Sequence, residues 1–301
     1  MSTQHTAHST QPQLDEKLVL VKNMLAEFKR VVVAFSGGVD STLLAKLARD
    51  VLGKPNALAV TADSPSLSRA DLTEAKRLAA QLDLWHRVIE TKEVGNPLYR
   101  ANTEGRCFVC RQTLFTELEE LAYDERIPVV LYGAIGDDLL SERPGQRAAL
   151  QFGVRSPLQE AGLAKWDVRE LARLLGIPNW DRPQNACLSS RIPHGHEVDE
   201  RKLRQIEQAE AFLREQGFKQ VRVRHLETHA RIEVPCDEVG RFQDASLQRR
   251  TAEAFSRLGF LDVAVDWEGY RPGGADHTPS NEPMLILTEP HLQNFTKGNF
   301  E

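Results

Sequence analysis

The segment Arg30-Val31-Val32-Val33-Ala34-Phe35-Ser36-Gly37-Gly38-Val39-Asp40-Ser41 joins an apolar run to a glycine-rich polar turn. The apolar run indicates a buried strand, and the residues that follow the turn have the composition of a helix. Such a turn lets the backbone approach a phosphate closely, and the helix start adds free N–H groups and partial positive charge. We therefore predict an anion site, with Ser36 and Ser41 as hydroxyl donors and Asp40 as a cation ligand or loop anchor.

The turn lacks the Gly-Lys-Ser/Thr ending with which a Walker-type P-loop brings a lysine to the β- and γ-phosphates. Its Ser-Gly-Gly-x-Asp-Ser pattern instead resembles the PP-loop of the N-type ATP pyrophosphatases. That resemblance implies bound ATP and Mg²⁺, cleavage of ATP between the α- and β-phosphates, and adenylation of a substrate oxygen. The ATP-binding residues that we predict lie on or after three expected strands: Ala34, Ser36, Gly37, Gly38, Asp40, Ser41, Ala62, Asp63, Gly133 and Asp138.

Length and composition limit the class of protein. The 301 residues suggest one large or two medium-sized domains, and an apolar fraction of 41% is ordinary for soluble cores. A net charge of −5 gives no global basic footprint for nucleic acid, and no apolar run reaches membrane-spanning length. Residues 1–13 lack the apolar core of a signal peptide. We expect a disordered tail at 1–13 and a cytoplasmic protein with neither a membrane nor a nucleic-acid partner.

Strand and helix patterns alternate over residues 14–196. We predict strands at Val31–Phe35, Ala57–Thr61, Trp85–Glu90 and Val129–Tyr132, and helices at Leu14–Phe28, Ser41–Val51, Ser68–Leu82, Arg111–Tyr123 and Lys165–Leu175. This alternation predicts an α/β domain with a doubly wound parallel sheet, whose ligands bind at the carboxyl ends of the strands. The loops after Phe35, Thr61 and Tyr132 would then face one crevice.

The pattern changes at residue 197, where we place the start of a smaller α+β domain that ends at residue 271. Its predicted elements are a helix at Asp199–Gln216, strands at Val221–Arg224 and Arg231–Val234, a helix at Val239–Leu258 and a strand at Val263–Asp266. A helix, a Gly-Phe pair and an alternating strand therefore occur twice, which indicates a weak internal duplication. Residues 272–301 are rich in Pro, Gly, Asn and Thr, and we expect a poorly ordered tail there.

Three further segments carry a more specific resemblance. They are Arg143-Pro144-Gly145, Val154-Arg155-Ser156-Pro157-Leu158 and Asn185-Ala186-Cys187-Leu188-Ser189-Ser190-Arg191-Ile192-Pro193-His194-Gly195. With the turn, they resemble the LarE family, the ATP-dependent sulfur transferases of nickel-pincer nucleotide cofactor synthesis. The resemblance implies adenylation of the carboxylates of pyridinium-3,5-dicarboxylate mononucleotide, then replacement of the adenylate by sulfur to give thiocarboxylates. Cys187 matches the cysteine that donates its sulfur in sacrificial members of this family.

Cys107 and Cys110 form a CxxC pair just before the helix predicted at Arg111–Tyr123, and a helix N-terminus favours thiolate. With Cys187 they are one short of a four-cysteine set. The three cysteines resemble those of the cluster-bearing LarE-like proteins and, more distantly, of the three-cysteine tRNA thiolases. We therefore predict a catalytic [4Fe–4S] cluster that Cys107, Cys110 and Cys187 hold, with one iron open to hydrosulfide.

Other uses of the cysteines stay open. The three could bind zinc together with His194 or His196, Cys107 and Cys110 could form a redox disulfide, or Cys187 could be sacrificed once per turnover. Cys236 is expected to be a partly buried structural cysteine. His225 and His229 are expected at the surface or in a hairpin rather than as ligands.

Arginines are the predicted contacts of the anionic substrate, because guanidinium groups pair with carboxylate and phosphate through two parallel hydrogen bonds. Arg191 lies in the cysteine-bearing segment, and we predict that it acts in catalysis and contacts the substrate. Arg222 and Arg224 share one face of a predicted strand, and Arg231 lies on the next strand. We predict that these three bind substrate, and the alternative is a solvated strand face.

Competing functions are a tRNA thiolase, an amidating ligase of the NAD- or GMP-synthase type, and a non-enzymatic binding module. A tRNA thiolase would need a basic surface or further cysteines, and this chain is acidic with four cysteines. An amidating ligase uses ammonia and needs no cysteine triad, and a binding module would leave the turn and the cysteines without a use. We expect an enzyme that takes sulfur from sulfide or a sulfur donor, and the LarE resemblance implies a homo-oligomer.

Overall fold

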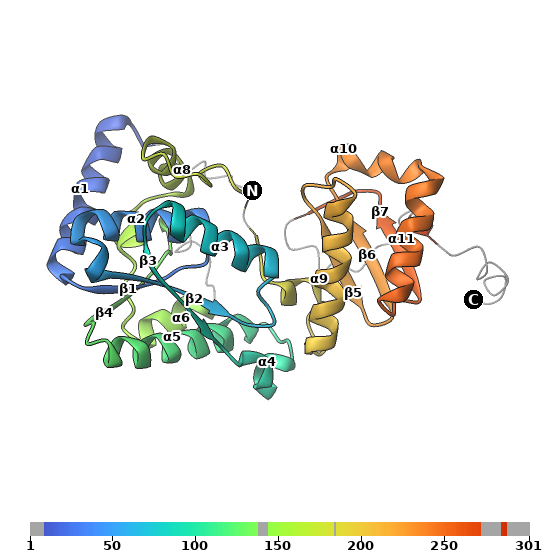
Figure 1. Cartoon of the computed structure of the whole chain (residues 1–301), viewed down its shortest axis with the longest axis horizontal. Helices are drawn as coiled ribbons and strands as arrows, with labels where there is room; N and C mark the ends of the chain where they lie inside the picture. The colour runs from blue at the N-terminus through green and yellow to red at the C-terminus, as the bar shows by residue number, and fades with distance from the viewer. Residues whose placement is uncertain (1–8, 138–143, 184, 272–283, 288–301) are drawn as a thin grey trace, which may run out of the picture. The chain divides into compact units, whose positions relative to one another are not determined.

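The computed structural model describes residues 9–137, 144–183, 185–271 and 284–287, and its chain divides into two compact units (Figure 1). The first comprises residues 1–99 and 104–185, and the second comprises residues 100–103 and 186–301. Segment 100–103 joins the second unit through Asn102, whose Nδ2 donates to the carbonyls of Pro193 and His196 at 2.7 and 2.9 Å. The domain boundary that we placed between residues 196 and 197 stays a prediction.

A parallel sheet of four strands, in the order β3-β2-β1-β4, forms the centre of the first unit. The strands are β1 (Val31–Ala34), β2 (Ala57–Asp63), β3 (Trp85–Glu90) and β4 (Val129–Tyr132). Alternate residues of a strand face opposite sides of a sheet, and in β1 both sets are apolar. Apolar side chains on both faces require a helical layer on each side.

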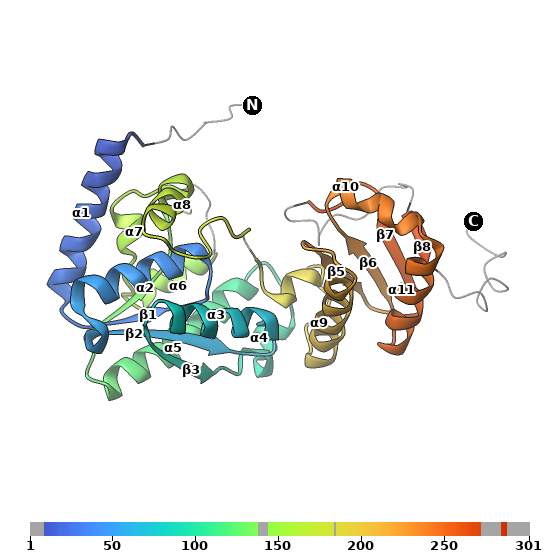
Figure 2. The same cartoon turned by 45° about the horizontal axis from the view of Figure 1, so that its top comes forward.

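Helices supply both layers (Figures 1 and 2). The first apolar cluster joins the Val31 and Val33 face to helices on one side of the sheet: α1 (Gln11–Phe28), α2 (Val39–Leu52), α3 (Arg69–Gln81), α7 (Pro157–Glu160) and α8 (Lys165–Leu174). The second joins the Val32 face to α5 (Arg106–Asp124) and α6 (Pro144–Gln151), and a short helix, α4 (Pro97–Arg100), precedes α5. The predicted doubly wound α/β fold is confirmed.

Three helices of the first unit begin earlier than the sequence pattern predicted, and α2 is one of them, at Val39 rather than Ser41. α1 begins at Gln11 rather than Leu14, because the backbone N–H of Thr10 donates to the side chain of Gln13 at 2.9 Å and Pro12 lies in the first turn. Residues 11–13, which we expected in a disordered tail, are therefore helical, and residues 1–8 lie outside the described ranges. α5 begins at Arg106 rather than Arg111, which places the CxxC pair within its first two turns.

The second unit is a smaller α+β unit with a four-stranded sheet in the order β5-β6-β7-β8. Its strands are β5 (Arg222–Leu226), β6 (His229–Glu233), β7 (Asp262–Asp266) and β8 (Met284–Leu287), and only β6 and β7 pair in parallel. α9 (Glu200–Glu215) and α11 (Ala245–Arg257) pack on the face that carries Val223, Ile232 and Val265. This confirms the predicted smaller domain of sheet and helices.

The second unit differs from the prediction in one helix and in the segment expected as a tail. The helix expected at Val239–Leu258 is broken into α10 (Cys236–Val239), a 3₁₀ turn and α11, since the Asp244 carboxylate caps α11 by accepting the N–H groups of Ser246 and Leu247. β8 lies in the segment expected as a tail, and the rest of that segment is outside the described ranges. His225 lies on the β5–β6 hairpin, one of the two expected places, where its side chain is buried and burial lowers its pKa to about 4. None of the described helices is long and apolar enough to cross a membrane.

Candidate active site

The turn between β1 and α2 has the backbone form that the sequence predicted. Gly37 adopts φ +71°, and a Cβ there would lie 3.1 Å from the Cα of Ala75 in α3, so only glycine fits. α2 begins at Val39 with Gly38 as its N-cap, which leaves the first N–H groups of the helix without intrahelical partners. The turn therefore presents backbone donors and the positive end of a helix dipole.

The hydroxyls of the turn bond to the turn itself. Ser36 Oγ and Ser41 Oγ are 3.1 Å apart, and the N–H of Gly38 donates to Ser36 Oγ at 3.3 Å. Ser41 Oγ also lies 3.1 Å from the carbonyl oxygen of Gly38. These short-range bonds define the conformation of the turn.

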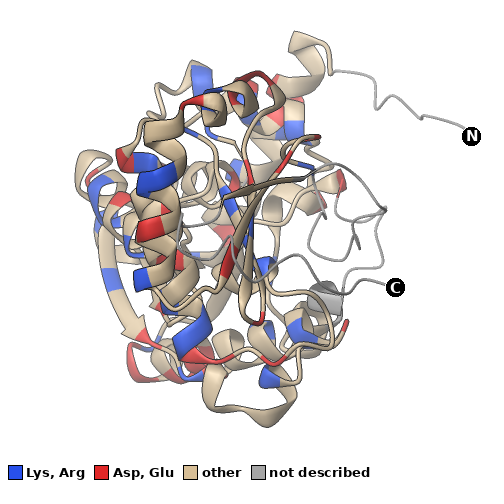
Figure 3. Cartoon of the chain, turned by 90° about the vertical axis from the view of Figure 1, so that its right-hand side faces the viewer, with Lys and Arg blue, Asp and Glu red and all other residues tan. Residues whose placement is uncertain are grey.

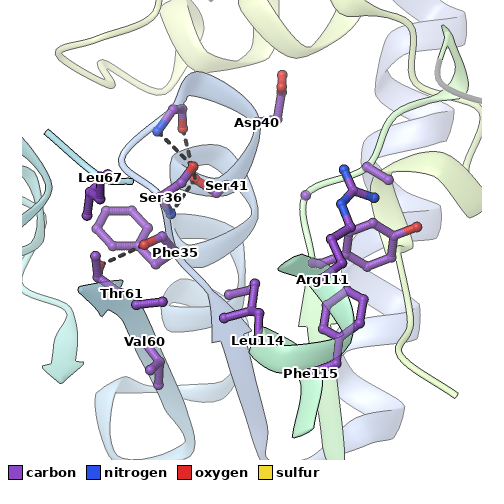
Figure 4. Close-up of a pocket in the computed structure, with 16 residues that line it drawn as sticks. Phe35, Ser36, Asp40, Ser41, Val60, Thr61, Leu67, Arg111, Leu114 and Phe115 are labelled. Carbon is purple, nitrogen blue, oxygen red and sulfur yellow. Dashed lines mark hydrogen bonds between the residues drawn. The ribbon is translucent and has the colours of Figure 1, made fainter. Parts of the chain in front are cut away.

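A pocket of about 270 Å³ opens at the carboxyl ends of β1, β2 and β4 (Figure 4). It brings together the predicted residues Ala34, Ser36, Gly38, Asp40, Ser41, Ala62 and Gly133. Gly133 approaches so closely that a Cβ on it would lie 2.8 Å from the backbone nitrogen of Ser41. Gly37 is not among the lining residues, Asp63 is paired with Arg69 at 2.6 Å, and Asp138 lies outside the described residues.

Asp40, the acidic residue of the turn, has a cationic partner from a distant part of the first unit. Lys165 Nζ lies 2.7 and 2.8 Å from its two carboxylate oxygens, and the backbone N–H of Lys165 donates to Asp137 at 3.0 Å. The sequence analysis missed Lys165 because 125 residues separate it from Asp40. Its charge offsets the carboxylate that would otherwise repel a phosphate.

Arg111 is a second residue that the sequence analysis missed. It lines the pocket from α5, with its guanidinium 5.6 Å from the ring centroid of Tyr132, and lies across the pocket from Ser36 (Figure 4). Within the described residues, no carboxylate forms an ion pair with it. A half-buried guanidinium without an acidic partner is suited to bind an anionic ligand. Its place directly after Cys110 was the available signal.

Cys107 and Cys110 lie on the helix that forms this wall of the pocket. Positions 107, 110, 111 and 114 recur at helical spacing, so the two cysteines share a stripe of α5 with Arg111 and Leu114, which line the pocket. Cys107 is exposed, Cys110 is partly buried, and neither is in a disulfide. The redox disulfide that the sequence left open is therefore not formed here.

Cys187 belongs to the second unit, where its thiol is exposed at the start of a 3₁₀ turn, Leu188–Arg191. The side chain of Arg191 is buried, at 1% exposure, and pairs with Glu210 at 2.8 Å. Its Nη1 donates to the carbonyls of Ala186 and Cys187 at 2.6 and 2.8 Å. In this arrangement Arg191 supports the loop that carries Cys187.

The three arginines expected to bind substrate are also buried. Arg224 and Arg231 both pair with Glu233, at 2.7 and 3.1 Å, so the solvated strand face is excluded for them. Arg222 lies 5.4 Å from the ring centroid of Tyr270, and burial lowers its pKa. Sequence spacing placed these arginines on one face correctly but could not reveal that Glu233 pairs with Arg224 and Arg231.

Metal-ligating side chains were sought among the described residues of both units. No group of three His, Cys, Asp or Glu residues within the described ranges is arranged to hold a metal ion. Of the histidines considered for zinc, His196 lies 2.8 Å from Glu227 through Nδ1. Cys236 is exposed rather than partly buried, with Sγ 2.8 Å from the carbonyl oxygen of Glu268.

Comparisons with known proteins agree with this geometry. Residues 16–110, which contain the turn, match the NAD synthase family model. An uncharacterised protein of Synechocystis sp. is 44% identical over 86% of this chain and 97% of its own length. The pyridinium-3,5-bisthiocarboxylic acid mononucleotide synthase of Lactiplantibacillus plantarum, a LarE protein, is 36% identical over 84% of this chain and 91% of its own length. The chain belongs to the LarE family. As a LarE protein with a PP-loop domain, it is an ATP-utilising sulfurtransferase.

Proposed function

We propose that this enzyme adenylates the carboxylates of pyridinium-3,5-dicarboxylate mononucleotide with ATP and converts them to thiocarboxylates. The name of its Lactiplantibacillus plantarum relative supports this substrate. The observation that carries the proposal is the stripe on α5, on which the CxxC pair continues the wall of the PP-loop pocket through Arg111 and Leu114. An adenylating site and a pair of thiols thus share one helix.

In the adenylation step, a substrate carboxylate oxygen attacks the α-phosphorus of ATP, and pyrophosphate leaves. The N–H groups at the start of α2 bind the β- and γ-phosphates, and Lys165 limits the repulsion between these phosphates and Asp40. Arg111 stabilises charge on the α-phosphate or the carboxylate from across the pocket. The carboxylates of Asp40 and Asp137, both bound to Lys165, are the oxygen donors suited to Mg²⁺.

In the sulfur-transfer step, hydrosulfide attacks the acyl carbon, the bond from this carbon to the AMP oxygen breaks, and thiocarboxylate, AMP and a proton are formed. We propose that Cys107, Cys110 and Cys187 hold a [4Fe–4S] cluster, which when bound supplies one iron not ligated by protein on which hydrosulfide can be held. Cys107 and Cys187 are exposed, which leaves their sulfurs accessible to iron. Cys107 and Cys110 lie in the first two turns of α5, three residues apart on one face of the helix.

A sacrificial Cys187 is the second candidate, and its exposed thiol favours it. In that route the Cys187 sulfur attacks the acyl carbon and displaces AMP, and elimination then leaves dehydroalanine in the chain and sulfur on the product. A cysteine used in this way makes the protein about 34 Da lighter, the mass of hydrogen sulfide. Cys107 and Cys110 would then be dispensable.

A tRNA substrate is disfavoured by the distribution of charge. Lysine and arginine are interspersed with aspartate and glutamate along the described helices and strands (Figure 3), whereas nucleic-acid binding usually needs a basic face. An amidating reaction of the NAD-synthase type would use the same adenylation but would not need the three cysteines. Sulfide or a sulfur donor, a homo-oligomeric state and a cytoplasmic location stay predictions, as does substrate binding by Arg191, Arg222, Arg224 and Arg231.

The adenylation step is tested by the products of ATP. Wild-type enzyme with the dicarboxylate mononucleotide should release AMP and pyrophosphate, and Asp40→Ala or Ser36→Ala should abolish this release without loss of the fold. Substrate-dependent ADP and inorganic phosphate would refute the proposed reaction.

The cysteine proposal is tested by anaerobic reconstitution with iron and sulfide. Alanine at position 107, 110 or 187 should lose bound iron and thiocarboxylate formation together, whereas Cys236→Ala, the matched control, should lose neither. Bound zinc would overturn the cluster. Iron-free protein that turns over once and becomes about 34 Da lighter at Cys187 would establish the sacrificial route instead.

A further inference from the structure

The carbonyl oxygen of Gly37, at the centre of the PP-loop turn, accepts hydrogen bonds from two side chains far along the chain. Asn179 Nδ2 lies 2.9 Å from this oxygen, and Arg182 Nη1 lies 3.2 Å from it. Both donors come from the segment that follows α8, within the first unit. No step described above uses either residue.

Each donor is itself held in place. Asn179 is buried, and its Nδ2 also lies 3.3 Å from Thr42 Oγ1 in α2. Arg182 Nη2 pairs with Asp71 of α3 at 2.6 Å, and the other oxygen of Asp71 accepts a bond from Asn185 at 2.7 Å. The two donors are therefore parts of a packed junction with α2 and α3 and have a defined direction.

The direction of the Gly37 carbonyl decides what the turn offers to a ligand. In a planar trans peptide, the C=O and the following N–H point in opposite directions. With the Gly37 oxygen held by Asn179 and Arg182, the N–H of Gly38 points toward Ser36 Oγ, 3.3 Å away on the pocket lining. A flipped peptide would turn a carbonyl oxygen toward the phosphates. Because both residues are glycine, no Cβ atom opposes a flip of this peptide.

We propose that Asn179 and Arg182 are positioning residues that lock the Gly37–Gly38 peptide in the orientation that binds the pyrophosphate portion of ATP. The inference rests on the use of ATP by this pocket and is independent of the sulfur source. It predicts a specific loss of affinity for the β- and γ-phosphates, since the adenosine portion of the nucleotide does not depend on this peptide.

The test uses Asn179→Leu, which keeps the size of the side chain without its donor, and Arg182→Met, which keeps the aliphatic stem. Calorimetry with magnesium pyrophosphate, ATP and AMP should show that each variant binds the first two about three- to tenfold more weakly, because the other donor remains. The double variant should lose more than the product of the two single effects, which together amount to about nine- to a hundredfold. AMP affinity should not change.

Matched controls and a conservative variant separate this role from general support of the fold. Asn56→Leu removes the hydrogen bond from Asn56 Nδ2 to the carbonyl of Leu52 at the end of α2, and Arg77→Met removes an exposed salt bridge with Glu74. Both variants should bind ATP and pyrophosphate as the wild type does. Arg182→Lys keeps one donor and should recover most of the affinity. Equal losses for AMP and pyrophosphate, or wild-type affinity in the double variant, would overturn the inference. Wild-type enzyme that binds no ATP would instead overturn the proposed use of the pocket.

Discussion

The two units of this chain hold positive charge in opposite ways. At the pocket of the first unit, charge comes from backbone N–H groups and from Arg111, which has no acidic partner among the described residues. In the second unit, Arg191, Arg224 and Arg231 are buried against Glu210 and Glu233. An arginine therefore indicates an anion site only where no carboxylate already neutralises its charge. The comparison predicts that substitutions at the pocket of the first unit impair function, and that substitutions at the buried ion pairs of the second unit reduce stability.

The largest expected effect is on the stability of the second unit. Glu210→Ala removes the carboxylate that Arg191 and Arg214 share, at 2.8 and 2.7 Å, and leaves a buried guanidinium without compensation. Such a change costs about 3–5 kcal/mol. Denaturant unfolding of the full chain should show this loss, while Glu74→Ala at an exposed pair should cost less than about 1 kcal/mol. If Glu210→Ala also weakened ATP binding by about the same free energy, the contrast between the two units would be wrong.

Arg111→Met tests the other side of the comparison. Loss of a charge-assisted hydrogen bond should reduce turnover by an amount equivalent to about 1.5–3 kcal/mol. The free energy of unfolding should change little, because Arg111 has no ion pair within the described residues. Steady-state kinetics with denaturant unfolding of the same protein checks both statements. A stable variant with wild-type turnover would remove Arg111 from the site.

Gly133→Ala sharpens the backbone part of the comparison. The added Cβ would lie 2.8 Å from the backbone nitrogen of Ser41, so the start of α2 must move. Overpacking of this kind typically costs about 1–3 kcal/mol, which should appear as weaker ATP binding by calorimetry. Gly95→Ala is the control, since its Cβ would meet nothing within 4 Å. Equal ATP affinity in the Gly133→Ala and Gly95→Ala variants would contradict the close approach of Gly133 to Ser41.

The smallest expected effect concerns pH and the buried His225 of the second unit. Burial lowers its pKa from 6.5 to about 4, so the unfolded chain binds more protons between these values. Stability should therefore fall as pH drops from 6.5 toward 4, by about 2 kcal/mol or less. His225→Gln should flatten this part of the stability curve, whereas His229→Gln at an exposed position should not. An unchanged slope in His225→Gln would assign the acid sensitivity to other groups.

Local sequence patterns predicted the strands and helices of the first unit well, because most of these elements are continuous segments with a recognisable apolar pattern. β1, the glycine turn and α2 are one continuous segment, and buried parallel strands give continuous apolar runs that are easy to recognise. Helix ends were less accurate, since α5 starts at Arg106 without a capping side chain. β8 was missed because its pairing with β7 is a long-range contact in a segment with a coil-like composition.

The partners of charged side chains were the least predictable part of the site. Lys165 meets Asp40, and Arg182 meets Asp71, only after the sheet and its helices are assembled. Likewise, the alternation of β5 put Arg222 and Arg224 on one face correctly, but the choice between substrate and buried carboxylate depends on the neighbouring strand and the loop before α9. Strand and helix periodicity contains no information about such pairs.

The hydroxyl contacts within the glycine turn bear on the rate at which product leaves. Ser36 and Ser41 bond to each other, and Ser36 accepts the N–H of Gly38, so any phosphate oxygen competes with these bonds for the same donors. Binding is therefore an exchange of one set of hydrogen bonds for another, and its net free energy is smaller than a count of contacts suggests. We expect these hydrogen bonds to form again when pyrophosphate leaves the turn. Such bonds would stabilise the empty turn and so weaken the binding of the product.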